Sequence, residues 1–313
     1  MANQKINFGK KKKKLNPKKI GITVVAALLV IFLGVKGVGA TTSYIAEKKE
    51  EKILQEKRAE AERIAAEKKR KEEEEAKKRM VGVNHDAKQY SYDALKVSEK
   101  LKTYDYTNNG EKIVFLTFDD GSSTTVTPQI LDTLKQNNVK ATFFVTGQNI
   151  ERGGKPAEAL VKRAFDEGNA IANHSYSHDY KYLYPGRTLN LDNFLADFNK
   201  TDEILKRVIS PYFSTRVLRC PGGHMSWKGM DTLDAYLNEN NMASIDWNAL
   251  NADAEGRKKN ASQLAEHAKK TAEGKEMVVI LMHDTYGKEE TAKALPEIIK
   301  YFKDNGYEFK TLA

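Results

Sequence analysis

The stretch that decides the fold is residues 114–121, Val-Phe-Leu-Thr-Phe-Asp-Asp-Gly. Its apolar and β-branched residues lead into two adjacent carboxylates and then Gly121, a pattern typical of a buried strand that stops at a turn. Asp is rarely buried without a partner. Two negative charges also repel each other in one apolar pocket, so Asp119 and Asp120 favour a bound metal or a shared proton. Alone, such a pair is more often a solvated strand end, and the rest of the chain decides between the two.

Outward from this stretch, strand-like runs alternate with amphipathic helical patterns through to the end of the chain. This βα alternation predicts a parallel sheet, and the length of the segment 111–313 suits a distorted (β/α) barrel. In such barrels the chemistry gathers at the carboxyl ends of the strands. The expected strands are 113–118, 141–146, 170–172, 217–219, 244–246 and 277–282, and the expected helices are 128–137, 157–167, 190–209, 230–240, 261–273 and 291–305.

Two histidines follow the third expected strand. His174 and His178 lie four residues apart, so they can meet on one face of a helical turn and bind one cation. A pair with this spacing is a weak signal by itself. With Asp120 as a hard ligand it becomes an Asp-His-His set with open coordination positions, which suits catalytic Zn²⁺ or a similar divalent ion.

Polar residues follow the later strands as well. Arg219 follows 217–218 and is either a surface ion pair or the group that holds one of the aspartates ionised. Asp246 and Trp247 follow 244–245, and His283 ends the very apolar run 277–282. Polar groups at five successive strand ends indicate a functional site.

Five motifs appear in order along these strand ends, and together they resemble the polysaccharide deacetylases of carbohydrate esterase family four, the NodB homology domain. The resemblance covers residues 111–313, and order, spacing and flanking strands all agree. The motifs are Thr-Phe-Asp-Asp-Gly at 117–121, His-Ser-Tyr-Ser-His at 174–178, Arg-Cys-Pro-Gly at 219–222, Asp-Trp at 246–247 and Leu-Met-His at 281–283.

The resemblance implies a role for each motif residue in hydrolysis of an acetamide. One Zn²⁺, Co²⁺ or other divalent ion per chain would be bound, and a backbone N–H would stabilise the oxyanion. The implied roles are general base for Asp119, metal ligands for Asp120, His174 and His178, orientation of Asp119 for Arg219, oxyanion donor for Gly222, acid for His283 with its pKa raised by Asp246, and acetyl-methyl pocket for Leu281.

The chain departs from the family pattern in two places. Gly222, followed by Gly223 and His224, stands where an aromatic residue is usual, and Ala243 stands where the fourth motif usually has an earlier aspartate. Both lie at the rim of the expected groove, so substrate choice is the open question. The candidates for contact with sugar are His224, Trp227 and Trp247, with core packing for the tryptophans and a solvated loop for His224 as the alternatives.

The net charge of +9 is concentrated at the N-terminal end. Residues 1–19 contain eight lysines and no acid, Lys36 adds one charge, and residues 45–80 carry 13 basic and 11 acidic side chains, which leaves about −2 for the rest. The globular part is therefore not basic, which argues against nucleic acid as a partner. The single cysteine, Cys220, excludes an internal disulfide and does not decide the compartment.

The N-terminal third predicts an exported, anchored protein. The apolar run at 20–40 is near bilayer length, and the lysines at 1–19 before it predict a cytoplasmic N-terminus with the catalytic domain outside. A cleavable signal peptide, with small residues at 38–40, is the alternative. The expected parts are a basic tail at 1–19, a transmembrane anchor at 20–40, a charged helical stalk at 41–80, a connector at 81–110 with one helix near 92–102, and the deacetylase domain at 111–313.

These features predict a membrane-tethered, metal-dependent N-deacetylase with a monomeric catalytic domain. Its substrate would be N-acetylglucosamine in cell-wall peptidoglycan or in the linkage unit of a wall polysaccharide. One alternative is an esterase that removes O-acetyl groups from a polysaccharide, because the same chemistry serves esters. Another is a catalytically silent wall-binding protein on the same fold, although no expected metal ligand is lost from this sequence.

Overall fold

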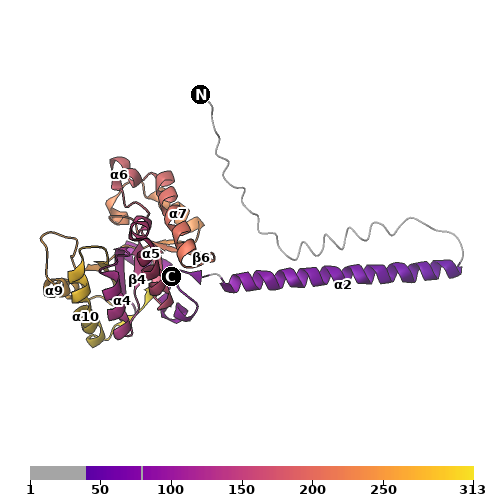
Figure 1. Ribbon diagram of the computed structural model, residues 1–313, viewed down its shortest axis with the longest axis horizontal. Coiled ribbons are helices and arrows are strands. Elements are labelled where there is room, and N and C mark those ends of the chain that lie inside the picture. Colours follow the sequence, from indigo (N-terminus) through magenta and orange to yellow (C-terminus); the bar gives the residue numbers. More distant parts are fainter. Residues whose placement is uncertain (1–39, 79) are drawn as a thin grey trace, which may run out of the picture. The chain divides into compact units, whose positions relative to one another are not determined.

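The computed structural model describes residues 40–78 and 80–313, which divide into two units near residue 74. The charged helical stalk expected over 41–80 is present as α2 (Ala40–Lys78), one unbroken helix about 58 Å long at 1.5 Å per residue (Figure 1). Its described side chains are exposed except for the half-buried Leu54, and pairs such as Glu67–Lys71 and Lys68–Glu72 lie one turn apart. Local propensity and charge pairing therefore stabilise the helix, whose described side chains form no buried face.

The predicted membrane anchor, residues 20–40, lies almost entirely outside the described residues. Within 40–78 and 80–313, no helix has both the length and the apolar character that a bilayer crossing requires.

The folded unit is built on a parallel sheet whose central strand is β3 (Ile113–Gly121), the stretch singled out in the sequence. Its longest neighbour, β10 (Met277–His283), pairs with it along seven residues. The strand order is β8-β7-β5-β4-β3-β10-β9, and β11 also pairs with β3. The other strands of this sheet are β4 (Thr142–Val145), β5 (Ala170–Asn173), β7 (Val217–Leu218), β8 (Ala243–Ser244), β9 (Ala249–Leu250) and β11 (Glu308–Phe309).

The sheet is curled, and its two edges lie close together without pairing. The edge strands β8 and β9 are joined by residues 245–248 alone, so their ends are at most about 18 Å apart. Asn248 covers part of the gap, because its side-chain amide bonds to the backbone of Met277 and Val279 on β10. The expected distorted barrel is thus a curled parallel half-barrel with a seam between β8 and β9.

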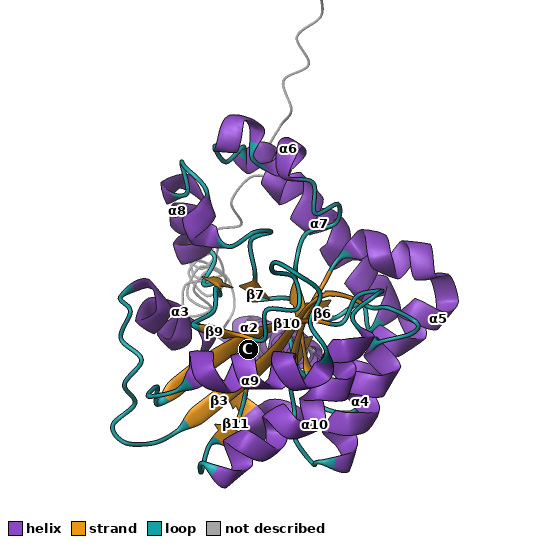
Figure 2. Ribbon diagram, turned by 90° about the vertical axis from the view of Figure 1, so that its left-hand side faces the viewer, coloured by secondary structure: helices purple, strands orange, loops and turns teal. Residues whose placement is uncertain are grey.

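Alternate residues of β3 face two different cores, as the period of a strand requires. Leu116 and Phe118 pack outward in the core beneath the surrounding helices, while Phe115 packs inward in the core enclosed by the curl. Figure 2 shows the strands surrounded by helices. The helices that follow the strands are α4 (Thr127–Gln136), α5 (Gly147–Asp166), α7 (Leu191–Val208), α8 (Asp231–Glu239), α9 (Ala261–Ala272) and α10 (Glu289–Asp304), with the short α6 (Tyr180–Leu183) after β5.

The expected connector, residues 81–110, lies within the folded unit. Two-residue strands β1 (Met80–Val81) and β2 (Ser91–Tyr92) pair with β6 (Phe213–Ser214) and β12 (Thr311–Leu312). The helix expected near 92–102 is α3 (Ala94–Lys102), which begins at the cap Asp93. Its apolar side chains join the core inside the curl. The sequence did not show this because each pairing is long-range and only two residues long.

Candidate metal centre and catalytic groups

The carboxyl ends of the strands bring the motif residues to one place. In the register of β3 and β10, Asp119 pairs with His283, so these two side chains start from neighbouring positions on the same face of the sheet. His174 follows β5, and Arg219 follows β7. The parallel topology therefore converts motifs up to 164 residues apart into one cluster.

Consecutive strand residues normally face opposite sides of a sheet, yet Asp119 and Asp120 both face the site. The register of β3 against β4 shifts between Asp119 and Gly121, and Asp120 has a φ of 65°. A bulge of this kind re-aims one side chain, and a positive φ at a residue other than glycine costs roughly 1–3 kcal/mol. The strain is stored where two carboxylates must point the same way.

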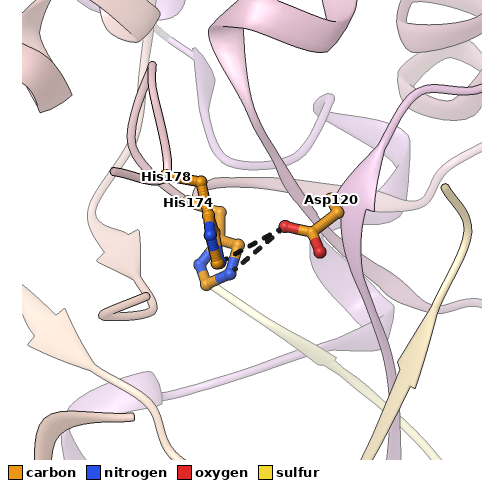
Figure 3. A group of neighbouring side chains, drawn as sticks. All are labelled: Asp120, His174 and His178. Atoms are coloured by element: carbon orange, nitrogen blue, oxygen red, sulfur yellow. Dashed lines mark ion pairs between the residues drawn. The ribbon is translucent and has the colours of Figure 1, made fainter. Parts of the chain in front are cut away.

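Asp120, His174 and His178 form the candidate metal site (Figure 3). Their ligand atoms lie within 4.8 Å of one another, and each histidine Nε2 is 3.6 Å from the Asp120 Oδ1. This Oδ1 is buried and has no hydrogen-bond partner among the residues that the structure describes. A buried, unsatisfied carboxylate oxygen facing two imidazole nitrogens is the donor set that a divalent ion would satisfy.

The protonation state of His174 suits a ligand. Burial and the neighbouring His178 lower the pKa of His174 to about 3, which keeps it neutral. Its Nδ1 lies 2.8 Å from the carbonyl oxygen of Arg219, which can only accept, so Nδ1 carries the proton and Nε2 keeps a free lone pair.

His174 and His178 are brought together by a loop, and the prediction that they lie on a helical turn is wrong. Residues 174–179 are not helical, and both Ser175 and His178 have positive φ values, 72° and 52°. The Asp197 carboxylate accepts from the N–H groups of Tyr176 and Ser177, and the Ser175 hydroxyl accepts from the N–H of His178. Side chains therefore replace the missing helical hydrogen bonds and fix the loop.

Asp119 is held by Arg219, as expected. The Arg219 side chain is fully buried, and its Nη1 donates to the Asp119 Oδ1 over 2.6 Å and to the Thr117 hydroxyl over 2.9 Å. Burial raises the pKa of Asp119, and the charge and hydrogen bond of Arg219 oppose that rise. The other oxygen, Oδ2, is not taken by Arg219 and lies 3.5 Å from the His174 Nε2, so it faces the candidate metal site.

The partner of His283 is Asp253, which corrects the role expected for Asp246. The His283 Nδ1 lies 2.7 Å from the Asp253 Oδ1, and the backbone N–H of His283 donates to the Asp253 Oδ2. Burial alone would lower the pKa of His283, but the hydrogen bond and charge of Asp253, helped by Asp119 and Asp120, raise it to about 9. The imidazole is therefore charged at neutral pH, as an acid must be.

Asp253 is a functional residue that sequence reasoning missed. It follows β9, a strand of two residues that is too short for a periodicity signal. The available signal was local: Asn-Ala-Asp at 251–253 places a carboxylate soon after an apolar pair, as at the other strand ends. Asn149, whose amide donates to the Asp120 carbonyl, carried no signal at all.

A pH profile separates Asp253 from Asp246. In Asp253→Asn, loss of the charge that raises the pKa of His283 is expected to move the alkaline limb of kcat/KM for acetate release down by about one to two pH units. The activity remaining at pH 7 falls accordingly. The measurement is initial rate against pH from 5 to 10. Asp246→Asn is the matched control, and an equal shift in that variant would contradict the assignment.

Asp246 instead organises the loop after β7. Its two carboxylate oxygens accept from the N–H groups of His224 and Met225. The loop begins at Gly222 and Gly223, whose φ values of 78° and 84° only glycine adopts readily. Within the described residues the N–H of Gly222 makes no hydrogen bond, which leaves it available to an oxyanion.

The four rim and pocket candidates have different surroundings. The Trp227 ring stacks on Tyr184 at 4.1 Å and its N–H donates to the Pro221 carbonyl, so it is part of the protein wall. The His224 Nε2 lies 3.1 Å from an Asp234 oxygen and is likewise engaged. Trp247 lines a cavity, and Leu281 is the half-buried residue in an otherwise buried part of β10. All four side chains are half-buried, and His224 and Trp247 both line that cavity.

A hollow of about 170 Å³ adjoins the metal ligands Asp120 and His178. Its wall is uncharged apart from these two, with amide and hydroxyl groups that include Gln148 and Thr146. The Thr146 hydroxyl is buried and has no hydrogen-bond partner in the described chain. Unsatisfied neutral polar groups suit a ligand rich in hydroxyl and amide groups.

A curled parallel sheet with a carboxylate, two histidines and a charged acid at its carboxyl edge is the arrangement found in (β/α)-barrel hydrolases whose chemistry is assisted by a metal. Comparison with known proteins agrees. Residues 106–240 match the family model for polysaccharide deacetylase. Two Bacillus cereus proteins named peptidoglycan-N-acetylglucosamine deacetylase are similar: one is 34% identical over 64% of this chain and 66% of its own, the other 31% identical over 66% and 88%.

A solved structure, a Streptococcus mutans CE4 esterase, is 37% identical with a TM-score of 0.68, covering 74% of this chain and 96% of that one. The chain belongs to the polysaccharide deacetylase family of hydrolases, as the motifs predicted. It spans about two-thirds of the length of the Bacillus cereus relative that is 34% identical. It spans 42% of the Listeria monocytogenes peptidoglycan-N-acetylglucosamine deacetylase, which is 31% identical.

Proposed function

We propose that this protein is a metal-dependent N-deacetylase that removes acetyl groups from N-acetylglucosamine residues of cell-wall peptidoglycan. One observation carries the proposal: the ligand atoms of Asp120, His174 and His178 converge beside the Arg219-held carboxylate of Asp119. The names of the relatives support both the reaction and the sugar. The intact set of side chains argues against a catalytically silent binding protein.

The proposed reaction uses each group according to its charge. A Zn²⁺ or similar divalent ion bound by the three ligands would supply a water of lowered pKa and polarise the acetamide carbonyl. Asp119, oriented by Arg219, accepts the proton of the attacking water at its Oδ2. Its raised pKa brings the carboxylate closer to the operating pH, which improves a general base.

The second half of the reaction is the departure of the amine. His283, kept charged by Asp253, donates its proton from Nε2 to the leaving nitrogen, since Nδ1 is already bonded to the carboxylate. The free N–H of Gly222 stabilises the negative oxygen, and Leu281 contacts the acetyl methyl group. The base Asp119 and the acid His283 then lie on neighbouring strands of the sheet, β3 and β10.

The test compares acetate release and wall chemistry. The full-length chain, with Zn²⁺ or Co²⁺ added, should release acetate from N-acetylglucosamine oligomers faster than from acetylated xylan; the reverse order would favour the O-acetyl esterase. In cells, mass spectrometry of wall fragments should show fewer free amines on peptidoglycan glucosamine when Asp119→Asn replaces the wild type. A change confined to the glucosamine that links a wall polysaccharide to peptidoglycan would move the substrate to that linkage unit.

We further propose that the deacetylase domain works outside the cell on a membrane tether. The support is the sequence alone: the lysine-rich residues 1–19, the apolar run at 20–40 and the charged helix after it. The full-length protein should remain in the membrane fraction after alkaline carbonate extraction and be digested by protease added to intact protoplasts. Release by carbonate, or protection from the protease, would reject the tether.

A further inference from the structure

The short helix after the loop of the metal ligands carries a tyrosine that no step of the proposed reaction uses. α6 begins at Tyr180, two residues after the ligand His178. Its cap, Asp179, accepts from the N–H groups of Lys181 and Tyr182, which fixes the start of the helix. The Tyr180 side chain is 43% exposed, and its hydroxyl has no hydrogen-bond partner among the described residues. This hydroxyl is therefore open to a ligand.

The ring of Tyr180 is held between two other rings. Its centroid lies 5.2 Å from that of His178 and 5.1 Å from that of Trp227. Trp227 is itself held in place, because its ring stacks on Tyr184 and its indole N–H donates to the Pro221 carbonyl. Aromatic contacts of this kind favour defined geometries. The direction of the Tyr180 hydroxyl is thus set before a substrate arrives.

The hydroxyl lies against Gly222, the residue whose backbone N–H is free. A Cβ atom at Gly222 would lie 3.3 Å from the Tyr180 hydroxyl oxygen and 3.0 Å from the Trp227 ring. Any side chain at this position would crowd both rings. The absence of a side chain at residue 222 is therefore what lets the hydroxyl lie beside that N–H.

One oxygen atom can reach both groups. A Cβ position is about 2.5 Å from the nitrogen of the same residue, so the Tyr180 hydroxyl oxygen and the Gly222 nitrogen are at most about 6 Å apart. Each hydrogen bond spans about 2.9 Å, so an oxygen between two donors at this separation can accept from both. The His178 ring, which also contacts Tyr180, belongs to the candidate metal site. The hydroxyl and the N–H therefore meet beside the place where an acetyl carbonyl would be polarised.

We infer that Tyr180 is a further catalytic residue, whose hydroxyl donates a hydrogen bond to the acetyl oxygen as negative charge develops on it. The N–H of Gly222 is the second donor, so the oxyanion hole is made from two different loops. No proton is transferred from the hydroxyl, because tyrosine keeps its proton near neutral pH. The oxyanion collapses to a carboxyl group when the amine leaves with the proton of His283. This assignment rests on the proposed hydrolysis of an acetyl group beside Asp119.

The test removes the hydroxyl alone. The full-length chain with added Zn²⁺ is assayed on an N-acetylglucosamine oligomer as wild type, Tyr180→Phe and Tyr182→Phe. In Tyr180→Phe kcat should fall about 10–100-fold, the range for one hydrogen bond to a charged group. KM should change by no more than about two-fold, because the carbonyl of the bound substrate carries little charge before the attack.

Tyr182→Phe is the matched control. Tyr182 lies on the same short helix and is also 43% exposed, but it is not among the side chains nearest to the Cβ position of Gly222. Its kcat should equal that of the wild type. Equal losses of kcat in the two variants would overturn the assignment, because the effect would then not depend on the place of the hydroxyl.

Metal content and thermal unfolding exclude an indirect role. Tyr180→Phe keeps the ring and its packing, so the bound metal and the Tm should match those of the wild type. A kcat that stays within about two-fold of wild type would contradict the hydrogen-bond contribution and overturn the assignment. A rise in KM at constant kcat would also reject it, since the hydroxyl would then bind the ground state. Loss of metal would instead make Tyr180 a positioning residue for His178.

Other acetyl compounds keep this result distinct from failure of the proposed function. If the oligomer releases no acetate, the same variants are compared on acetylated xylan and 4-nitrophenyl acetate, whose hydrolysis passes through a similar oxyanion. If neither is hydrolysed, calorimetry measures the binding of acetohydroxamate, a compact acetyl compound with a charged oxygen. Slower hydrolysis or weaker binding in Tyr180→Phe than in Tyr182→Phe would support the oxyanion donor while the proposed substrate fails. Equal values in the two variants would reject the donor.

Discussion

Asp119→Asn is expected to lower kcat/KM for acetate release by about a thousand-fold, within the range of 10²–10⁴ that a general base contributes. Asparagine keeps the shape and the acceptor for Arg219 but cannot take a proton. The loss should fall on kcat, because the base acts in the transition state and the substrate is held by other groups. Initial rates with a saturating N-acetylglucosamine oligomer measure this effect.

The same variant tests the buried ion pair. Arg219 is fully buried beside Asp119, and removal of one partner from such a pair costs about 3–5 kcal/mol because the other charge stays buried and unpaired. Urea unfolding should show a loss near the lower end, since the amide oxygen still accepts. Asp202→Asn is the control for reduced stability alone: it changes a half-buried carboxylate that accepts hydrogen bonds from Asn173 and Thr215, outside the reacting groups. If Asp119→Asn kept a tenth of wild-type kcat/KM, Asp119 would not be the base.

His178→Ala is expected to remove stoichiometric metal and with it at least about a hundred-fold of kcat/KM. His178 is the more exposed of the two histidine ligands, so its loss leaves no buried cavity and the fold should persist. Elemental analysis of the dialysed full-length chain gives the metal content independently of activity. His174→Ala should have the same effect on metal and a larger effect on stability, because His174 is buried.

The control for His178→Ala is His85→Ala, an exposed histidine outside the site. It should retain both metal and activity. Retention of a full equivalent of metal in His178→Ala and in His174→Ala would show that the three converging side chains are not the metal site, whatever the activity of the variants.

The sequence correctly predicted the elements with long, regular patterns. The six apolar residues that begin β10 and the alternation of strands with amphipathic helices identified a parallel sheet, because side-chain periodicity is a local property. The motifs at the strand ends predicted the convergence of Asp120, His174 and His178, since parallel strands end at the same edge. Residues 1–39 and their expected anchor are a prediction that the described part of the chain does not test.

Strands of only two residues could not be predicted from side-chain periodicity. β1, β2 and their partners are too short to show a period, so the segment 81–110 read as a connector although α3 closes the core inside the curl. The loop that carries His174 and His178 was expected to be a helical turn, because the spacing of four fits a helix equally well. Its backbone is instead fixed by the distant carboxylate of Asp197.

The sequence by itself determined which side chains could do chemistry, because a carboxylate or imidazole after an apolar strand is visible without any long-range contact. Only the tertiary structure decided which carboxylate serves His283. Asp246 follows β8, the strand beside β7, whereas Asp253 follows β9, the strand beside β10. The physical reason is that strand order is fixed by the packing of the whole sheet, and two-residue edge strands carry no local pattern from which their neighbour can be predicted.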